Sequence, residues 1–161
     1  MDFNIATTSL TTFLWFDTEA LDAARFYVDL FPGSRLGDIS YYQADAQRPE
    51  GSILVVEFER IGQPFAALNG GPEFPYSEAV SFQVSRETQD DVDRIWNTIV
   101  DNGGSKSMCG WCKDRWGVSW QIIPVAPTRA LQGLDGYDSK YAFTAMMKMS
   151  KIIVADLVPT Q

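Results

Sequence analysis

The predicted secondary structure of this chain runs through one order of elements twice, and this repeat limits the fold more than any other feature. Apolar periodicity predicts a strand at 11–16 and an amphipathic helix at 19–31, followed by three further strands. After a stretch with two Gly and two Pro, 70–77, the order begins again with a strand at 79–85 and a helix at 88–100. The chain is therefore expected to be an α+β protein built from two paired βαβββ modules.

The two modules are expected to form one domain that spans residues 1–161. Module one covers about 11–71, module two about 79–124, and a C-terminal helical extension about 137–158. The last helix is predicted at 141–156, where apolar residues recur at helical spacing. A chain of 161 residues buries about 68–70% of its unfolded surface when it folds as one domain, so a sizeable core is expected.

The starts of the two long helices carry residues that are typical of helix caps. Asp17 precedes the first helix and Thr88 begins the second, and the side-chain oxygen of such a residue can accept a hydrogen bond from a first-turn N–H. Residues 1–10 show no pattern and are expected to fray.

The stretch 109–124, CGWCKDRWGVSWQIIP, predicts two strands joined by a tight turn at 113–117. After this turn the residues alternate between an apolar face that contains Trp120 and a polar face that contains Gln121. The strand at 79–85 alternates in the same way. If helices cover the apolar faces, the polar faces line a cavity, to which the first module adds Thr12 or Asn69. The second module would supply Ser81, Gln83, Ser119 and Gln121.

The charge of the chain argues against several partners. A net charge of −8 and a pI near 4.4 leave no basic patch for nucleic acid or an anionic membrane. No apolar run reaches the roughly 20 residues of a membrane span, and the first residues do not resemble a secretory signal. A soluble, cytoplasmic protein is expected, and an acidic chain favours a cationic ligand over an anionic one.

The chain contains no histidine. This removes the usual general base near neutral pH and the commonest ligand of transition metals. It excludes Ser-His-Asp and Cys-His catalysis within this chain, and it excludes an iron site of two His and one carboxylate.

Four segments of the sequence resemble the PhnB-like family, which belongs to the vicinal oxygen chelate superfamily with glyoxalase I, extradiol dioxygenases and bleomycin-resistance proteins. These segments are LWFDTEALDAARFYVDLFPGSR, GQPFAALNGGPEF, AVSFQVSRETQDDVDRIW and CGWCKDRWGVSWQIIP. The resemblance covers roughly residues 11–124 and the AMMKMSKI run. It implies the paired βαβββ fold, usually in a homodimer.

The resemblance also identifies the positions at which metal-binding members of the superfamily place two His and two Glu. By register these positions are approximately Thr12, Asn69, Ser81 and Gln121. Since none is His or a carboxylate, no metal and no cofactor are expected. Family members often carry a methyltransferase label connected with demethylubiquinone, but no GxGxxG motif follows a predicted strand here, so the sequence does not support that label.

Other reactive residues have simpler expected roles. Cys109 and Cys112 form a lone CxxC within a strand, where they point to opposite faces and are expected to remain free thiols unless a dimer assembles a four-cysteine zinc site. Asp114 and Arg115 are expected to stabilise the turn and to form a surface pair there. Glu57 and Glu59 share one strand face, which is expected to be an exposed face.

The favoured hypothesis is a metal-free protein that binds a small organic ligand on its polar faces against aromatic walls, and the acidic charge would suit a cationic ligand. Bleomycin-resistance proteins, which act by sequestration, are the precedent that the resemblance supplies. One alternative is a lyase, isomerase or dioxygenase whose metal is held by oxygen ligands from Glu57, Glu59, Glu73, Asn69 and Gln121.

The other alternative is a structural or interaction dimer in which the trough is filled with side chains. The Met-rich last helix, with Met146, Met147 and Met149, would then be the partner surface.

Overall fold

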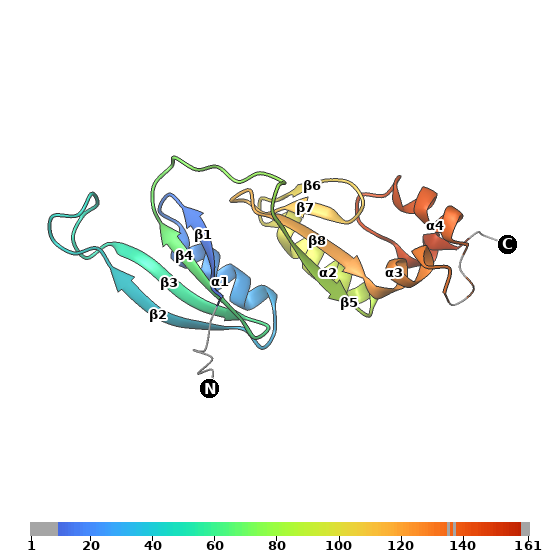
Figure 1. Ribbon diagram of the computed structural model, residues 1–161, viewed down its shortest axis with the longest axis horizontal. Helices are drawn as coiled ribbons and strands as arrows, with labels where there is room; N and C mark the ends of the chain where they lie inside the picture. The colour runs from blue at the N-terminus through green and yellow to red at the C-terminus, as the bar shows by residue number, and fades with distance from the viewer. Residues whose placement is uncertain (1–9, 135, 137, 159–161) are drawn as a thin grey trace, which may run out of the picture. The chain divides into compact units, whose positions relative to one another are not determined.

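The computed structural model describes residues 10–134, 136 and 138–158, so nearly all of the segment expected to fray lies outside the described residues. The chain divides into two compact units, 1–75 and 76–161. Each unit contains a four-stranded sheet of mixed direction with a helix against one face, which confirms the α+β fold of βαβββ modules (Figure 1). Within the described residues, no helix is long and apolar enough to cross a membrane.

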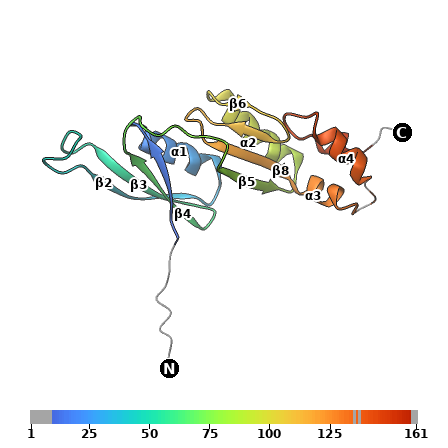
Figure 2. The same cartoon turned by 45° about the horizontal axis from the view of Figure 1, so that its top comes forward.

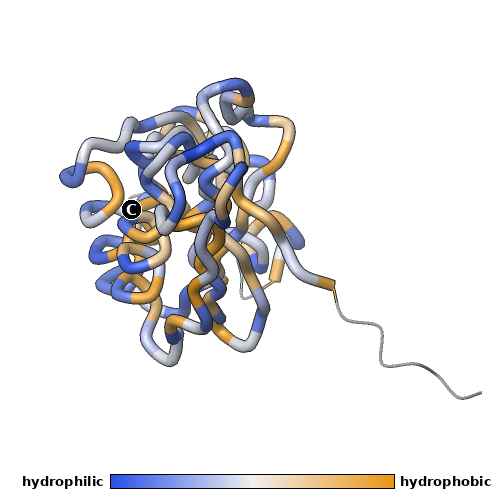
Figure 3. Tube along the Cα trace, turned by 90° about the vertical axis from the view of Figure 1, so that its left-hand side faces the viewer, coloured by the Kyte–Doolittle hydropathy of each residue, from blue (hydrophilic) through white to orange (hydrophobic). Residues whose placement is uncertain are grey.

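The first unit has the strand order β1-β4-β3-β2. Strands β1 and β4 pair in parallel, and the other neighbours are antiparallel. Hydrophilic and hydrophobic residues follow one another at short intervals along the Cα trace (Figure 3). The elements are β1 (Thr12–Phe16), α1 (Ala20–Leu30), β2 (Arg35–Tyr41), β3 (Ile53–Arg60) and β4 (Gln63–Asn69).

Helix α1 covers one face of this sheet through a stripe of small and aromatic residues. Its buried Tyr27 lies 6.0 Å, ring centre to ring centre, from Phe58, which stacks on Phe65 at 5.3 Å. The guanidinium of Arg60 lies 4.5 Å from the centre of the Phe65 ring, and burial lowers the pKa of Arg60 to about 10. These rings fix which face of the sheet is covered by the helix.

The start of α1 is capped by Asn69, not by Asp17 as the sequence predicted. The Asn69 carboxamide oxygen accepts a hydrogen bond of 2.8 Å from the backbone N–H of Ala20. Asp17 instead forms an ion pair of 2.8 Å with Arg48. The helix begins at Ala20, three residues after Asp17, which is beyond the position from which a cap reaches the first turn.

The second unit has the strand order β5-β8-β7-β6, with β5 and β8 parallel. Helix α2 lies against one face of this sheet (Figure 2). The predicted cap is confirmed, because the Thr88 hydroxyl accepts a hydrogen bond from the backbone N–H of Asp91. The elements are β5 (Ser81–Arg86), α2 (Gln89–Asp101), β6 (Ser105–Lys106), β7 (Trp111–Lys113) and β8 (Ser119–Pro124).

The C-terminal extension is helical, but the single helix predicted at 141–156 is wrong in extent. After residue 124, in the part of the chain that is called the C-terminal extension from here on, the chain forms three elements. They are α3 (Val125–Leu131), α4 (Ser139–Met146) and a 3-10 turn, η1 (Val154–Leu157). Between α4 and η1 the backbone turns outward to pair with the loop between β6 and β7. There the carbonyls of Met149 and Ser150 accept hydrogen bonds of 2.8 and 2.7 Å from loop N–H groups, so they are not available to a helix.

Asp114 organises the turn between β7 and β8, which confirms its expected part in the turn, but it is buried and does not lie at the surface as expected. Its side chain is 4% exposed. One carboxylate oxygen accepts hydrogen bonds from the backbone N–H groups of Trp116 and Val118, and the other accepts one of 2.9 Å from the indole of Trp120. Such a carboxylate can be buried because its hydrogen bonds replace those it made to water.

We expect Asp114→Ala to lower the free energy of unfolding by roughly 2–4 kcal/mol, because three donors, two of them buried, lose a charged acceptor. Urea denaturation would measure this change. Asp101→Ala is the matched control, since Asp101 is an exposed carboxylate in the same unit and its loss should cost less than about 0.5 kcal/mol. Equal midpoints for the two variants would contradict the structural role of Asp114.

Candidate functional site

The face of the second sheet opposite α2 carries two neighbouring rows of uncharged polar side chains. Parallel pairing of β5 and β8 sets Ser81 beside Ser119, which form the first row, and Gln83 beside Gln121, which form the second row. The Gln121 side-chain nitrogen donates a hydrogen bond of 2.8 Å to the Ser81 hydroxyl. In the next strand Trp111 lies opposite Gln121, which adds an aromatic side chain to the second row. The structure therefore brings together the four residues that the sequence placed on this face.

Two atoms of this face have hydrogen-bonding capacity that the described residues do not use. Ser119 is 1% exposed, and its hydroxyl has no hydrogen-bond partner within the described part of the chain. The carboxamide of Gln121 donates to Ser81, while its oxygen accepts no hydrogen bond from any described residue. A buried hydroxyl without a partner costs about 1–3 kcal/mol, whereas the carboxamide oxygen of the partly exposed Gln121 is open to a ligand.

Thr12 and Asn69 do not share such a face. In the first sheet both lie on the side covered by α1, since Thr12 pairs with buried Phe65, and Asn69 binds the start of the helix. Both amide atoms of Asn69 are occupied, because its nitrogen also donates a hydrogen bond of 3.0 Å to the carbonyl of Ile53. Phe13 lies on the opposite face, one residue away from the register that the sequence suggested.

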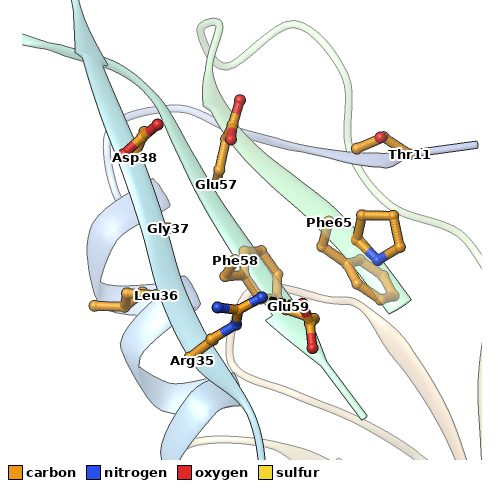
Figure 4. Close-up of a pocket in the computed structure, with 10 residues that line it drawn as sticks. Thr11, Arg35, Leu36, Gly37, Asp38, Glu57, Phe58, Glu59 and Phe65 are labelled. Atoms are coloured by element: carbon orange, nitrogen blue, oxygen red, sulfur yellow. Dashed lines mark hydrogen bonds and ion pairs between the residues drawn. The ribbon is translucent and has the colours of Figure 1, made fainter. Parts of the chain in front are cut away.

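A pocket of about 310 Å³ lies in the first unit and is bordered by carboxylates and a hydroxyl. Figure 4 shows the carboxylates of Asp38 and Glu57 on neighbouring strands, while Arg35 and Glu59 approach one another. Arg35 and Glu59 form an exposed ion pair of 2.7 Å. Asp38 and Glu57 form no ion pair with any described residue. The pocket therefore offers two uncompensated negative charges.

The sequence identified Glu57 and Glu59 but missed Asp38. The pairing of β2 with β3 shifts register between Leu36 and Ile39. Simple alternation of side chains along β2 therefore does not predict that Asp38 faces the same pocket as Glu57. Gly37 was the signal available in the sequence, because a glycine inside a strand often marks a bulge or a close approach of another strand. In the structure, a Cβ at this position would lie only 3.2 Å from the Glu57 Cβ.

Metal ligands are sparse in the described part of the chain. No group of three or more Cys, Asp or Glu side chains is arranged there to hold a metal ion. Cys109 and Cys112 are free thiols. Burial, with a smaller contribution from Asp114, raises the pKa of Cys112 to about 12, so this thiol stays protonated. Glu73 is exposed in the loop after β4.

The methionines of the extension have divided roles. Met146 and Met149 pack against the buried cluster of the extension, which consists of Ala130, Ala142, Ile152 and Leu157. Met147 is 43% exposed, so it is the member of the predicted partner surface that is most open to solvent.

A family model described as 3-demethylubiquinone-9 3-methyltransferase matches residues 8–123. A solved structure of a PhnB protein from Bacillus cereus, provisionally given the same methyltransferase description, is 29% identical. That alignment covers 73% of this chain and 100% of the other, with a TM-score of 0.66. A Pseudomonas aeruginosa protein is 20% identical, with coverage of 73% and 98% and a TM-score of 0.59.

A second Bacillus cereus protein, provisionally described as a glyoxalase, is 14% identical, with coverage of 73% and 99% and a TM-score of 0.51. At this identity the likeness shows the fold alone. None of the curated proteins compared with the chain matches it.

We expect Asn69→Ala to lower the free energy of unfolding by about 1–3 kcal/mol, because the Ala20 N–H and the Ile53 carbonyl lose their partner. Gln121→Ala should cost less than about 1 kcal/mol, since it removes one partly exposed hydrogen bond. Urea denaturation of both variants tests whether Asn69 is a structural residue. A larger loss for Gln121→Ala than for Asn69→Ala would reverse the assignment.

Proposed function

The chain belongs to the PhnB-like family of the vicinal oxygen chelate superfamily, and we propose that it binds a small organic molecule on the polar face of its second sheet. The observation that carries this proposal is the pair of polar rows formed by β5 and β8, with the hydrogen bond between Gln121 and Ser81 at their centre. The proposal retains the homodimer that the family resemblance implies, and it requires no metal.

The hydrogen-bonding groups of this face favour an uncharged part of a ligand. Gln121 presents its carboxamide oxygen as an acceptor, while Ser81 keeps its own O–H for donation after it accepts from Gln121. Lys113 borders the first row, but its charge is compensated by an ion pair of 2.6 Å with Glu78.

The aromatic side chain of Trp111 favours a ligand with a planar group. Trp111 is the cross-strand neighbour of Gln121, so an aromatic surface adjoins the carboxamide. Ligand sites commonly combine such an apolar wall with a few fixed polar groups that orient the ligand. A flat molecule with a carbonyl or hydroxyl oxygen could contact Trp111 and form hydrogen bonds with Gln121 and Ser81. The ligand class that best fits is therefore a planar, oxygen-bearing aromatic compound.

A thermal-shift screen of uncharged aromatic carbonyl and phenol compounds tests this function, because a ligand that binds only the folded state raises the melting temperature. Gln121→Leu should weaken binding of the best compound about tenfold, the effect of about 1.4 kcal/mol. Gln132→Leu is the control, since Gln132 is exposed on the surface of the extension. The proposal fails if Gln121→Leu binds the best compound as tightly as wild type, or if no compound stabilises the protein at millimolar concentration.

The carboxylate pocket of the first unit favours a second candidate function, the binding of an organic cation. Its volume of about 310 Å³ suits a small amine. Arg35 also lines the pocket but is paired with Glu59. Asp38 and Glu57 therefore supply negative charge without an ion-pair partner in the described part of the chain. The net charge of −8 acts in the same direction by attracting cations from a distance.

We expect Glu57→Gln to weaken binding of benzylamine, used as the probe, about fivefold at low salt, with the difference shrinking in high salt because exposed charges are screened. Isothermal titration calorimetry at two ionic strengths measures both effects. Glu50→Gln changes the net charge equally but lies in the exposed loop before β3, outside the pocket. Equal effects of the two substitutions would show that the pocket does not bind the amine.

A further inference from the structure

Two sulfur atoms that are far apart in the sequence meet at the surface of the second unit. The thiol of Cys109 lies 3.6 Å from the thioether sulfur of Met147. Both side chains reach solvent, since Cys109 is partly exposed and Met147 is 43% exposed. This pair of sulfurs belongs neither to the polar face of the second sheet nor to the carboxylate pocket of the first unit.

Hydrogen bonds between the hairpin tip and the segment after α4 hold the two sulfurs together. Cys109 and Gly110 form the tip of the hairpin between β6 and β7, with positive φ angles of 55° and 81°. Their N–H groups donate to the carbonyls of Met149 and Ser150, and the Ser150 hydroxyl donates back to the carbonyl of Ser107. These bonds fix the segment after α4, and with it Met147, beside the hairpin tip.

A thiol and a thioether are ligands that favour a soft metal ion. Thiolate and thioether sulfurs prefer Cu(I), whereas Mg²⁺ and Ca²⁺ require oxygen ligands. A metal at about 2.3 Å from each sulfur, the length of a zinc–thiolate bond, would subtend an S–metal–S angle of roughly 100° across this gap. Structural zinc takes four such ligands. Two-coordinate Cu(I) is close to linear, so the bent angle across this gap requires a trigonal Cu(I) site with a third sulfur.

A third sulfur is available in the same loop. Met108 precedes Cys109 and is 60% exposed, and its unbranched side chain has three rotatable bonds. Cys112 is not a candidate, because it is buried and its thiol remains protonated. The neighbouring Met146 and Met149 are packed against the buried cluster of the extension.

We propose that Cys109 and Met147, with Met108 as a third ligand, form a Cu(I) site that joins the hairpin tip to the C-terminal extension. Binding replaces the S–H bond of Cys109 by an S–Cu bond and releases one proton to solvent, while the copper remains Cu(I) throughout.

Anaerobic titration of the full, untagged chain with the Cu(I)–bicinchoninate complex tests the site. Wild type should remove one equivalent of copper from the chromophore, with a new ultraviolet absorption from the copper–thiolate bond. Cys109→Ser should abolish this transfer. Met147→Leu, which keeps the size and apolar character of the side chain, should weaken binding at least tenfold, and Met146→Leu should leave it unchanged.

Three results would overturn the proposal. They are the absence of copper transfer to wild type, full binding by Cys109→Ser, and equal affinities for Met147→Leu and wild type, which would mean that the thiol binds without the thioether. Far-ultraviolet circular dichroism and urea midpoints of each variant show that it is folded. Cys112→Ala, which removes the buried thiol instead, should still bind one equivalent of copper.

Discussion

The parallel pairing of the first and last strands of each sheet is the constraint on which the rest of the structure depends. In the second sheet this pairing brings residues about 40 positions apart into register, so that Ser81 meets Ser119 and Gln83 meets Gln121. Because side chains alternate along a strand, register also decides which residues share a face. The buried Asp114, which shapes the turn leading into β8, supports this arrangement.

One helix in each unit then assigns different roles to the two faces of the sheet. Aromatic and aliphatic side chains must be removed from water, so the faces under α1 and α2 contain the core. The opposite faces can keep polar groups and differ in chemistry. The second sheet presents neutral amides and hydroxyls, whereas the first presents the carboxylates of Asp38, Glu57 and Glu59. The same fold can therefore support binding of ligands with different charge.

The C-terminal extension adds a surface beyond the segment that the family model matches, which ends at residue 123. It has its own small buried cluster and is attached through polar groups. The Gln89 side chain binds both the carbonyl of Ile152 and the N–H of Val154, and the hairpin tip binds Met149 and Ser150. This attachment places Met147 beside Cys109, so the proposed metal site exists only because the extension docks there.

The sequence by itself determined the two βαβββ modules, the covered faces and the polar rows of the second sheet, because alternation and helical periodicity are local properties of the chain. Tertiary structure decided what depends on contacts between distant segments. Asn69 caps α1 from a neighbouring strand, and the irregular register of β2 brings Asp38 into the carboxylate pocket. The break in the last predicted helix could not be predicted from the sequence either, because the carbonyls of Met149 and Ser150 accept hydrogen bonds from a hairpin tip about 40 residues earlier. Hydrogen bonds between segments far apart in the chain leave no periodic trace in the sequence, and only the folded chain shows them.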